Sequence, residues 1–220
     1  MFEDKSQEIT EAMLDGLRAS LSVKMSPKRY RHTCEVEKMA VRLGELYLPE
    51  KIALLRGAAL LHDLTKELKW EQHEEILREH GISLTEEDFL TQKTLHARTA
   101  ALLIPEQYPA FATEELILCV RYHTTGRAGM SLAEKLIYLA DYIDLSRSFE
   151  DCVRLREIFF GAAPSEMAYD ERLSHLRDTL ILSLDMTVSA LVAEGKIVSA
   201  ETFAARNELL TEKAREIQKK

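Results

Sequence analysis

The apolar run over residues 52–61, Ile-Ala-Leu-Leu-Arg-Gly-Ala-Ala-Leu-Leu, ends directly in His62 and Asp63. Its length and composition predict a buried helix, and two polar side chains at the end of such a helix are costly unless they have partners. A divalent transition metal would be a suitable partner, because imidazole and carboxylate together bind such ions. Taken alone, such a pair is more often an ordinary helix end or a hydrogen-bonded pair of side chains than a metal site.

The rest of the chain also favours helices. Only eight glycines and five prolines occur in 220 residues, and Ala, Leu, Glu, Lys and Arg, which have high helix propensity, dominate. No segment alternates polar and apolar residues as a strand would. The expected fold class is therefore all-α.

Apolar spacing, N-cap residues and breaking residues predict the individual helices. They are expected at about residues 6–23, 26–47, 49–63, 70–81, 93–104, 113–123, 131–143, 151–161, 166–194 and from 199 to the end, with a short segment opening at 85. Pro105 is expected to end the helix over 93–104. The domain organisation expected is an N-terminal helix over 1–25 packing on the core, a core over 26–160, and C-terminal helices over 161–220 that are structural or mediate oligomerisation.

Charge and cysteine content exclude several classes of protein. The formal net charge of −8 argues against binding a nucleic-acid polymer through a broad basic surface, although it allows a small anionic ligand. Cys34, Cys119 and Cys152 form no Cys-x-x-Cys pair and give no disulfide framework, so we expect buried thiols. Without a signal-peptide pattern or a run of 18 apolar residues, we expect a cytoplasmic protein that does not bind membranes.

Several polar residues end or lie within apolar helices. They are His32, His62, His96 and His123, with Asp63 and Asp141 as carboxylates on the same kind of surface. Each alone has an ordinary explanation, such as a core histidine bonded to a backbone carbonyl. Together they come from five helices of an all-helical chain, which is a common way to build a metal site from inward-facing side chains. The other histidines, His73, His80 and His175, are expected at the surface.

The ordered set His32, His62-Asp63 and Asp141 resembles the His…His-Asp…Asp signature of the HD-domain superfamily of metal-dependent phosphohydrolases. Further motifs are similar to its YqeK-like branch, the bacterial symmetrical diadenosine tetraphosphate hydrolases. These motifs are His-Asp-x-x-Lys at 62–66, His96, His-Thr-Thr-Gly-Arg at 123–127, Met-Ser-Leu-Ala-Glu-Lys at 130–135 and Tyr-Leu-Ala-Asp-Tyr-Ile at 138–143. The resemblance covers about residues 28–160 and implies an HD-domain helical bundle with additional C-terminal helices.

The resemblance also implies a site and a reaction, the hydrolysis of diadenosine tetraphosphate to two ADP by a water that two metal ions activate. One ion would be held by His32, His62, Asp63 and Asp141, and the other by His96, His123 and the shared Asp63. The family precedent is iron, divalent or of mixed valence, and manganese or another transition metal suits the same ligands. Asp63 and Lys66 would be catalytic, Lys66 by stabilising phosphoryl charge. The substrate-binding residues would be Lys66, Thr125, Gly126, Arg127 and Arg147.

Two departures from the family pattern stand out. The family's Ile-Glu-Pro-Gly-Arg is replaced by Ile143-Asp-Leu-Ser-Arg147, so the arginine is kept but the Pro-Gly turn is lost. The segment 195–220 lies beyond the expected end of the family core and inherits no function from the resemblance. The long helices after residue 150 either cover the core of one protomer or pair two chains in a homodimer.

Two alternatives of function stay open. The first is an HD phosphohydrolase acting on another nucleotide, such as a deoxynucleotide or a cyclic dinucleotide, and the Thr-Thr-Gly loop favours the tetraphosphatase over it. The second is a nucleotide-binding regulatory module without turnover, and the intact set of metal ligands together with Lys66 argues against it.

Overall fold

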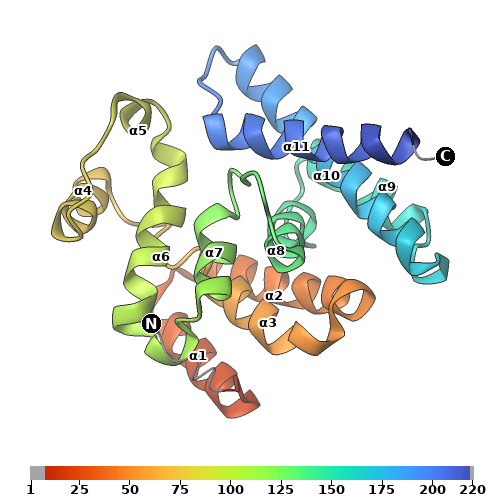
Figure 1. Ribbon diagram of the computed structural model, residues 1–220. Helices are drawn as coiled ribbons and strands as arrows, with labels where there is room; N and C mark the ends of the chain where they lie inside the picture. The colour runs from red at the N-terminus through yellow and green to blue at the C-terminus, as the bar shows by residue number, and fades with distance from the viewer. Residues whose placement is uncertain (1–7, 219–220) are drawn as a thin grey trace, which may run out of the picture.

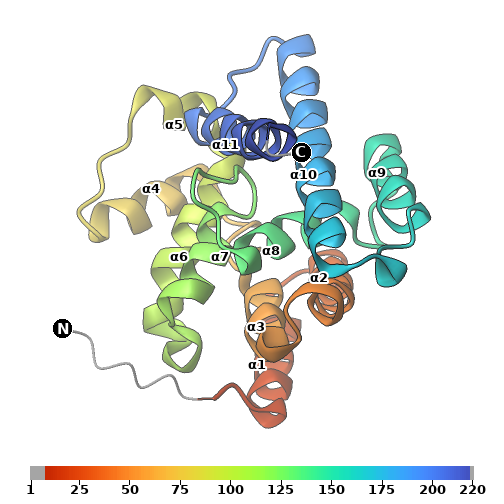
Figure 2. The same ribbon diagram turned by 45° about the vertical axis from the view of Figure 1, so that its right-hand side comes forward.

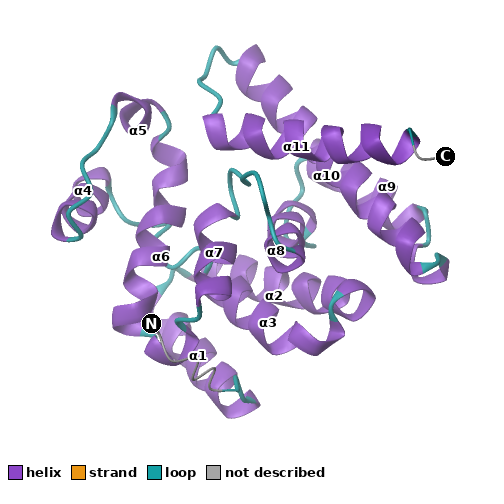
Figure 3. Ribbon diagram, viewed as in Figure 1, coloured by secondary structure: helices purple, strands orange, loops and turns teal. Residues whose placement is uncertain are grey.

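The computed structural model describes residues 8–218, which form eleven α-helices and no strand (Figure 1, Figure 3). The helices are α1 (Glu11–Lys24), α2 (Pro27–Tyr47), α3 (Ile52–Leu61), α4 (Trp70–Glu79), α5 (Glu86–Leu90), α6 (Leu95–Gln107), α7 (Glu114–Tyr122), α8 (Leu132–Ile143), α9 (Glu150–Gly161), α10 (Tyr169–Ala193) and α11 (Ala200–Ile217). The expected all-α fold is confirmed. The first residues of the helix expected over 6–23 lie partly outside the described residues. No helix within residues 8–218 is both long and apolar enough to span a membrane.

Local capping sets most of the helix ends where the sequence predicts them. The Ser26 side chain accepts a hydrogen bond from the amide of Arg29, and Ser131 forms a capping box with Glu134. The expectation for Pro105 is wrong, since α6 continues to Gln107. Because Pro105 lies in the last turn, its missing amide removes one hydrogen bond and the helix loses little by continuing.

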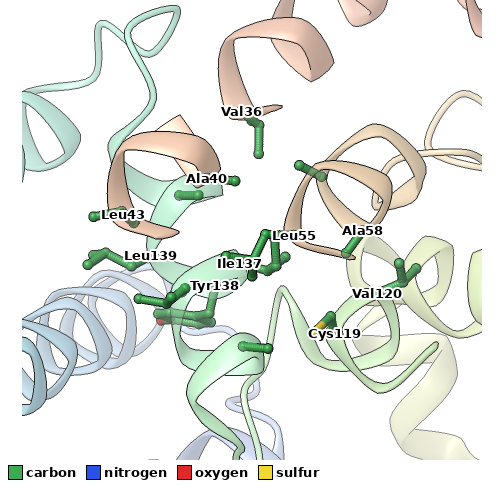
Figure 4. Packing of buried hydrophobic residues seen from close by; sticks show 14 of the residues in the cluster. Val36, Ala40, Leu43, Leu55, Ala58, Cys119, Val120, Ile137, Tyr138 and Leu139 are labelled. Atoms are coloured by element: carbon green, nitrogen blue, oxygen red, sulfur yellow. The ribbon is translucent and has the colours of Figure 1, made fainter. Parts of the chain in front are cut away.

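A core of apolar side chains from α2, α3, α7 and α8 holds the bundle together (Figure 4). It includes Val36 and Leu43 of α2, Leu55 of α3, Val120 of α7 and Ile137 of α8, all 0% exposed. The helices α2 and α3 approach closely at Gly44, where an added Cβ atom would lie 2.9 Å from Leu55 Cδ1. The absence of a side chain there lets the two helices that carry His32 and His62 pack tightly.

The C-terminal helices cover the end of the bundle from which the loop between α7 and α8 projects. The helix α10 packs against α8 and α9, and α11 turns back to lie beside α10 (Figure 2). The loop touches α11, because an added Cβ atom at Gly126 would meet Ala205 Cβ at 3.1 Å. The segment beyond residue 195 is therefore in direct contact with the loop that follows His123.

Candidate metal centre

The structure brings together six side chains from five helices and their ends. They are His32 of α2, His62 and Asp63 after α3, His96 of α6, His123 after α7 and Asp141 of α8. Two groups have donor atoms that lie within 4.8 Å of one another: one is His32, His62 and Asp141, and the other is His62, Asp63 and His123. These two groups contain five of the six residues named from the sequence, and His96 joins them through Asp63, whose Oδ1 lies 3.2 Å from His96 Nε2.

Asp63 lies between the two sides of the cluster. Its Oδ2 atom is 3.3 Å from His62 Nε2 and 3.6 Å from His32 Nε2. Its Oδ1 atom is 3.2 Å from His96 Nε2 and 3.8 Å from His123 Nε2. On the first side, Asp141 Oδ1 lies 3.0 Å from His32 Nε2. Each carboxylate oxygen of Asp63 thus faces a different pair of imidazoles.

The end of α3 explains how adjacent residues can point at one cluster. After Leu61 the chain leaves the regular helix in tight turns, with hydrogen bonds from Leu64 N to Leu61 O at 3.1 Å and from Lys66 N to Asp63 O at 3.0 Å. In a regular α-helix, successive side chains point about 100° apart. The tight turns let His62 and Asp63 converge.

The backbone fixes the tautomers of the histidines. The Nδ1 atoms of His62, His96 and His123 lie 2.6, 2.8 and 2.7 Å from the carbonyl oxygens of the residues three positions earlier. Because a carbonyl oxygen can only accept, each Nδ1 donates and leaves Nε2 facing the cluster, as in a metal-ligating histidine.

In His32, a side chain instead of a backbone carbonyl fixes the same tautomer. Ser146 Oγ donates to Asp144 and therefore accepts from His32 Nδ1 across 3.1 Å. The backbone and Ser146 thus orient all four Nε2 atoms alike.

This arrangement calls for a cation. The Nε2 atoms of His96 and His123 lie 3.1 Å apart, so two lone pairs face each other. The Nε2 atoms of His32 and His62 are buried and make no well-directed hydrogen bond within the described residues. Four imidazoles and two carboxylates suit a borderline divalent metal. The residues present therefore fit metal ions.

The protonation of the cluster without a metal follows from burial and charge. Burial disfavours a charged His62, but the carboxylates of Asp63 and Asp141 outweigh it and raise the pKa of His62 to about 10. Burial alone would raise the pKa of Asp63, yet His62 and His96 hold that pKa well below its usual range. On the other side, burial lowers the pKa of His96 and, strongly, that of His123.

Three cationic side chains surround the cluster. Arg29 forms an ion pair with Asp63, and Arg147 Nη2 lies 2.5 Å from Asp141 Oδ1. Lys66 Nζ lies 3.1 Å from His96 Nε2, and burial lowers its pKa. Sequence reasoning missed Arg29, although its position three residues before His32 places it on the same helix face.

The other expected substrate-binding residues contact partners that do not belong to the cluster. Thr125 donates to Glu201 of α11 at 2.9 Å, and Gly126 packs on the same helix. Arg127 is held by Glu134, with Nε to Oε1 at 2.7 Å. Their roles in binding substrate stay predictions.

Sequence reasoning misplaced His73 and overlooked Asp144. His73 is 6% exposed and bonds to Thr99, so it is not a surface residue. Although α4 is rich in glutamate, His73 and Leu77 occupy its inward face. His175 is partly buried and stacks on Phe159 with ring centroids 5.2 Å apart.

Asp144 is fully buried beside His32 and Arg147. The altered motif before Arg147 was the sequence signal that could have identified it.

Two of the remaining expectations hold only in part. His80 is the C-cap of α4, before Gly81 at φ +69°, but it is partly buried rather than exposed. Among the cysteines, Cys119 and Cys152 are buried, whereas Cys34 is only partly so.

Comparison with known proteins gives one consistent result. Residues 29–146 match the HD domain family. The chain is 31% identical over 190 residues to the symmetrical bis(5'-nucleosyl)-tetraphosphatase of Halalkalibacterium halodurans, covering 86% of this chain and 92% of that protein. It is 29% identical over 169 residues to the Staphylococcus aureus protein of the same name, covering 75% and 83%.

A solved structure is also similar. The crystal structure of a Clostridium acetobutylicum protein, described as a predicted HD superfamily hydrolase involved in NAD metabolism, superposes with a TM-score of 0.77. It is 32% identical in sequence, and the match covers 90% of this chain and 97% of that one. The similarity thus extends beyond the metal cluster to nearly the whole fold.

Proposed function

The chain belongs to the HD domain family, and we propose on that basis that it is a metal-dependent hydrolase that cleaves diadenosine tetraphosphate symmetrically into two ADP. The observation that carries this proposal is the position of Asp63, whose two oxygens face two different pairs of histidines. Nearly full-length similarity to symmetrical tetraphosphatases supports the choice of substrate.

We assign two metal positions to the cluster. His32, His62 and Asp141 would hold the first ion, and His96 and His123 the second, with Asp63 shared between them. Iron is the proposed metal, and manganese is the first substitute to test, because this donor set suits borderline ions better than magnesium. Bound metal ions would polarise a phosphoryl oxygen and make a water molecule more acidic.

The protein's own residues bind and orient the phosphates. Lys66, a compact charge beside His96, would stabilise negative charge on the phosphoryl group under attack. Arg147 would contact an outer phosphate, and the Thr125–Arg127 loop would do so after a shift from its present partners. Water adds to one central phosphorus and the bond to the opposite ADP breaks, which yields two ADP.

The helices over 161–220 have a structural role in this proposal. Among them, α11 holds the loop after His123 in place through its contacts with Thr125 and Gly126. Pairing of two chains through these helices stays a prediction, which the mass of the protein in solution would test.

Product analysis tests the function. The purified chain, reconstituted with iron or manganese, is incubated with diadenosine tetraphosphate and the nucleotides are separated by chromatography. We expect ADP alone, and no product from chelator-treated protein. AMP together with ATP would contradict symmetric cleavage. Absence of hydrolysis with metal bound would overturn the proposal and favour another nucleotide substrate.

A further inference from the structure

A cavity of about 350 Å³ lies between the end of α5 with the segment 91–94 that follows it on one side and the end of α10 with the α10–α11 turn on the other. Figure 2 shows α5 beside the beginning of α11. We call this space the α5–α11 cavity. Thr124 and Thr125, which directly follow His123, line its inner end. Two residues of its wall therefore follow directly, in the sequence, a histidine of the candidate metal centre.

Phe89, Leu90, Leu191 and Ile197 form an incompletely covered apolar part of its wall, and the other lining side chains are polar. Phe89, Leu90 and Ile197 line it and remain 51%, 63% and 44% exposed. At the inner end, the hydroxyl oxygen of Thr124 is buried and has no hydrogen-bond partner within residues 8–218. An apolar wall beside polar groups, one of them unsatisfied, is typical of a small-molecule site, where the polar groups fix the orientation of the ligand.

A second cavity lies beside this space and reaches His96 of the candidate metal centre. It measures about 430 Å³, is lined by Lys66, His96 and Trp70, and shares Gln92 and Lys93 with the α5–α11 cavity. A ligand spanning both cavities would pass the ammonium groups of Lys66 and Lys93. Such a ligand would meet first His96 of the cluster, then the two lysines, and finally the α5–α11 cavity. A chain of phosphates that ends in an aromatic base has groups that suit these positions in the same order.

We propose that the α5–α11 cavity binds the purine base of one nucleoside of the substrate, with the adjoining phosphates running past Lys93 toward Lys66. The proposal rests on the function proposed above and names its base-binding site. The Thr124 hydroxyl would bond to the edge of the base, and Leu191 and Ile197 would cover its face. Both of these residues lie outside the matched HD region, which ends at residue 146. The C-terminal segment thus supplies part of the substrate site.

An intrinsic fluorescence probe lies beside this site. Trp70 is the only tryptophan, and its ring centroid lies 5.0 Å from that of Phe89 on the cavity wall. A base bound against Phe89 is expected to change the fluorescence of Trp70. Binding of ADP can therefore be followed without turnover.

The test compares Leu191→Glu with Val192→Glu in the full chain. Leu191 lines the cavity, whereas Val192 is 63% exposed and does not. A buried charge in the cavity should weaken ADP binding, measured by Trp70 fluorescence and calorimetry, by about tenfold or more. Val192→Glu should bind ADP as the unaltered protein does, and inorganic pyrophosphate, which lacks a base, should bind all three proteins equally. Ile197→Glu, in the exposed turn, is a second variant should Leu191→Glu fail to fold.

The outcomes distinguish a failure of the proposed base site from a failure of the proposed function. Unchanged ADP binding in the folded cavity variants, equal weakening in Val192→Glu, or a parallel loss of pyrophosphate binding would overturn the base site. Symmetric cleavage of diadenosine tetraphosphate with unchanged ADP binding would overturn the base site alone. Loss of ADP binding in the cavity variants, with AMP and ATP as products of the unaltered protein, would overturn symmetric cleavage and leave the base site standing.

Discussion

The hydroxyl of Thr125 donates a hydrogen bond to Glu201 across 2.9 Å and so joins the loop after His123 to the C-terminal helix α11. Glu201 also pairs with Arg121 of α7 at 3.0 Å. Farther along the loop, the amide of Gly129 donates to Glu208 at 2.5 Å. The helix α11 therefore holds the loop at two points.

Replacing Glu201 with alanine should lower the free energy of unfolding by about 1–2 kcal/mol, because the buried Thr125 hydroxyl loses its charged acceptor. Urea denaturation of the metal-loaded protein measures this change. Asn207→Ala, an exposed substitution on the same helix, should have no effect. Equal stability of Glu201→Ala and the unaltered protein would show that α11 does not hold the loop.

The sequence predicted which polar side chains come together in the cluster but missed several of their neighbours, for a physical reason. The six cluster residues end or lie within apolar helices, where a polar residue is conspicuous. Glu201 and Arg29 lie on helices rich in charge, where most charged side chains are solvated. Glu201 meets Thr125 only because α11 packs against the loop, and Arg29 meets Asp63 only because α2 packs against α3.

In the metal-free protein, stability should fall as the pH rises above neutral. The pKa of His62 is about 10 in the folded state against 6.5 for a free histidine. Its stabilising charge is fully present below pH 6.5 and is lost as the pH rises through 10. Asp63 and Asp141, whose pKa values are lowered from 3.8, act in the opposite sense and lose their contribution as the pH falls below that value. His96 and His123, whose pKa values are lowered from 6.5 by burial, also lose stability as the pH falls below 6.5, because the unfolded chain then takes up protons that the folded chain does not. Stability should therefore be greatest near pH 6.5.

Thermal denaturation of chelator-treated protein across this range checks the expectation. The variant His62→Gln, which does not titrate, should lose less stability between neutral and alkaline pH. Parallel pH profiles for His62→Gln and the unaltered protein would contradict the assigned role of the His62 charge.

Lys66→Met should reduce turnover of diadenosine tetraphosphate by about a hundredfold while leaving the metal content unchanged, because it removes one charge that stabilises the transition state. Lys38→Met is the control, since Lys38 is a solvent-exposed lysine paired with Glu35. Steady-state kinetics and elemental analysis give the two readouts. A Lys66→Met protein with unaltered turnover would remove Lys66 from the mechanism.

Ser146→Ala should weaken metal binding by about tenfold, because His32 Nδ1 loses the hydroxyl that orients its ring. Ser146 and Asp144 occupy the stretch where the Pro-Gly turn is absent, and the Ser146 amide donates to Asp144 Oδ1 at 2.8 Å. Competition with a chromogenic chelator measures the affinity. Ser148→Ala in the same loop is the matched control, and equal affinities for the two variants would argue against this role of Ser146.

The shared position of Asp63 is tested most directly by counting metal ions. Elemental analysis of reconstituted protein should find two ions per unaltered chain. Asp88→Ala removes another buried carboxylate, one that pairs with Arg98, and should retain both ions. Asp63→Ala should lose both ions and hydrolysis together, because each side of the cluster loses a carboxylate oxygen. An Asp63→Ala protein that keeps two ions and cleaves diadenosine tetraphosphate at the unaltered rate would contradict the account.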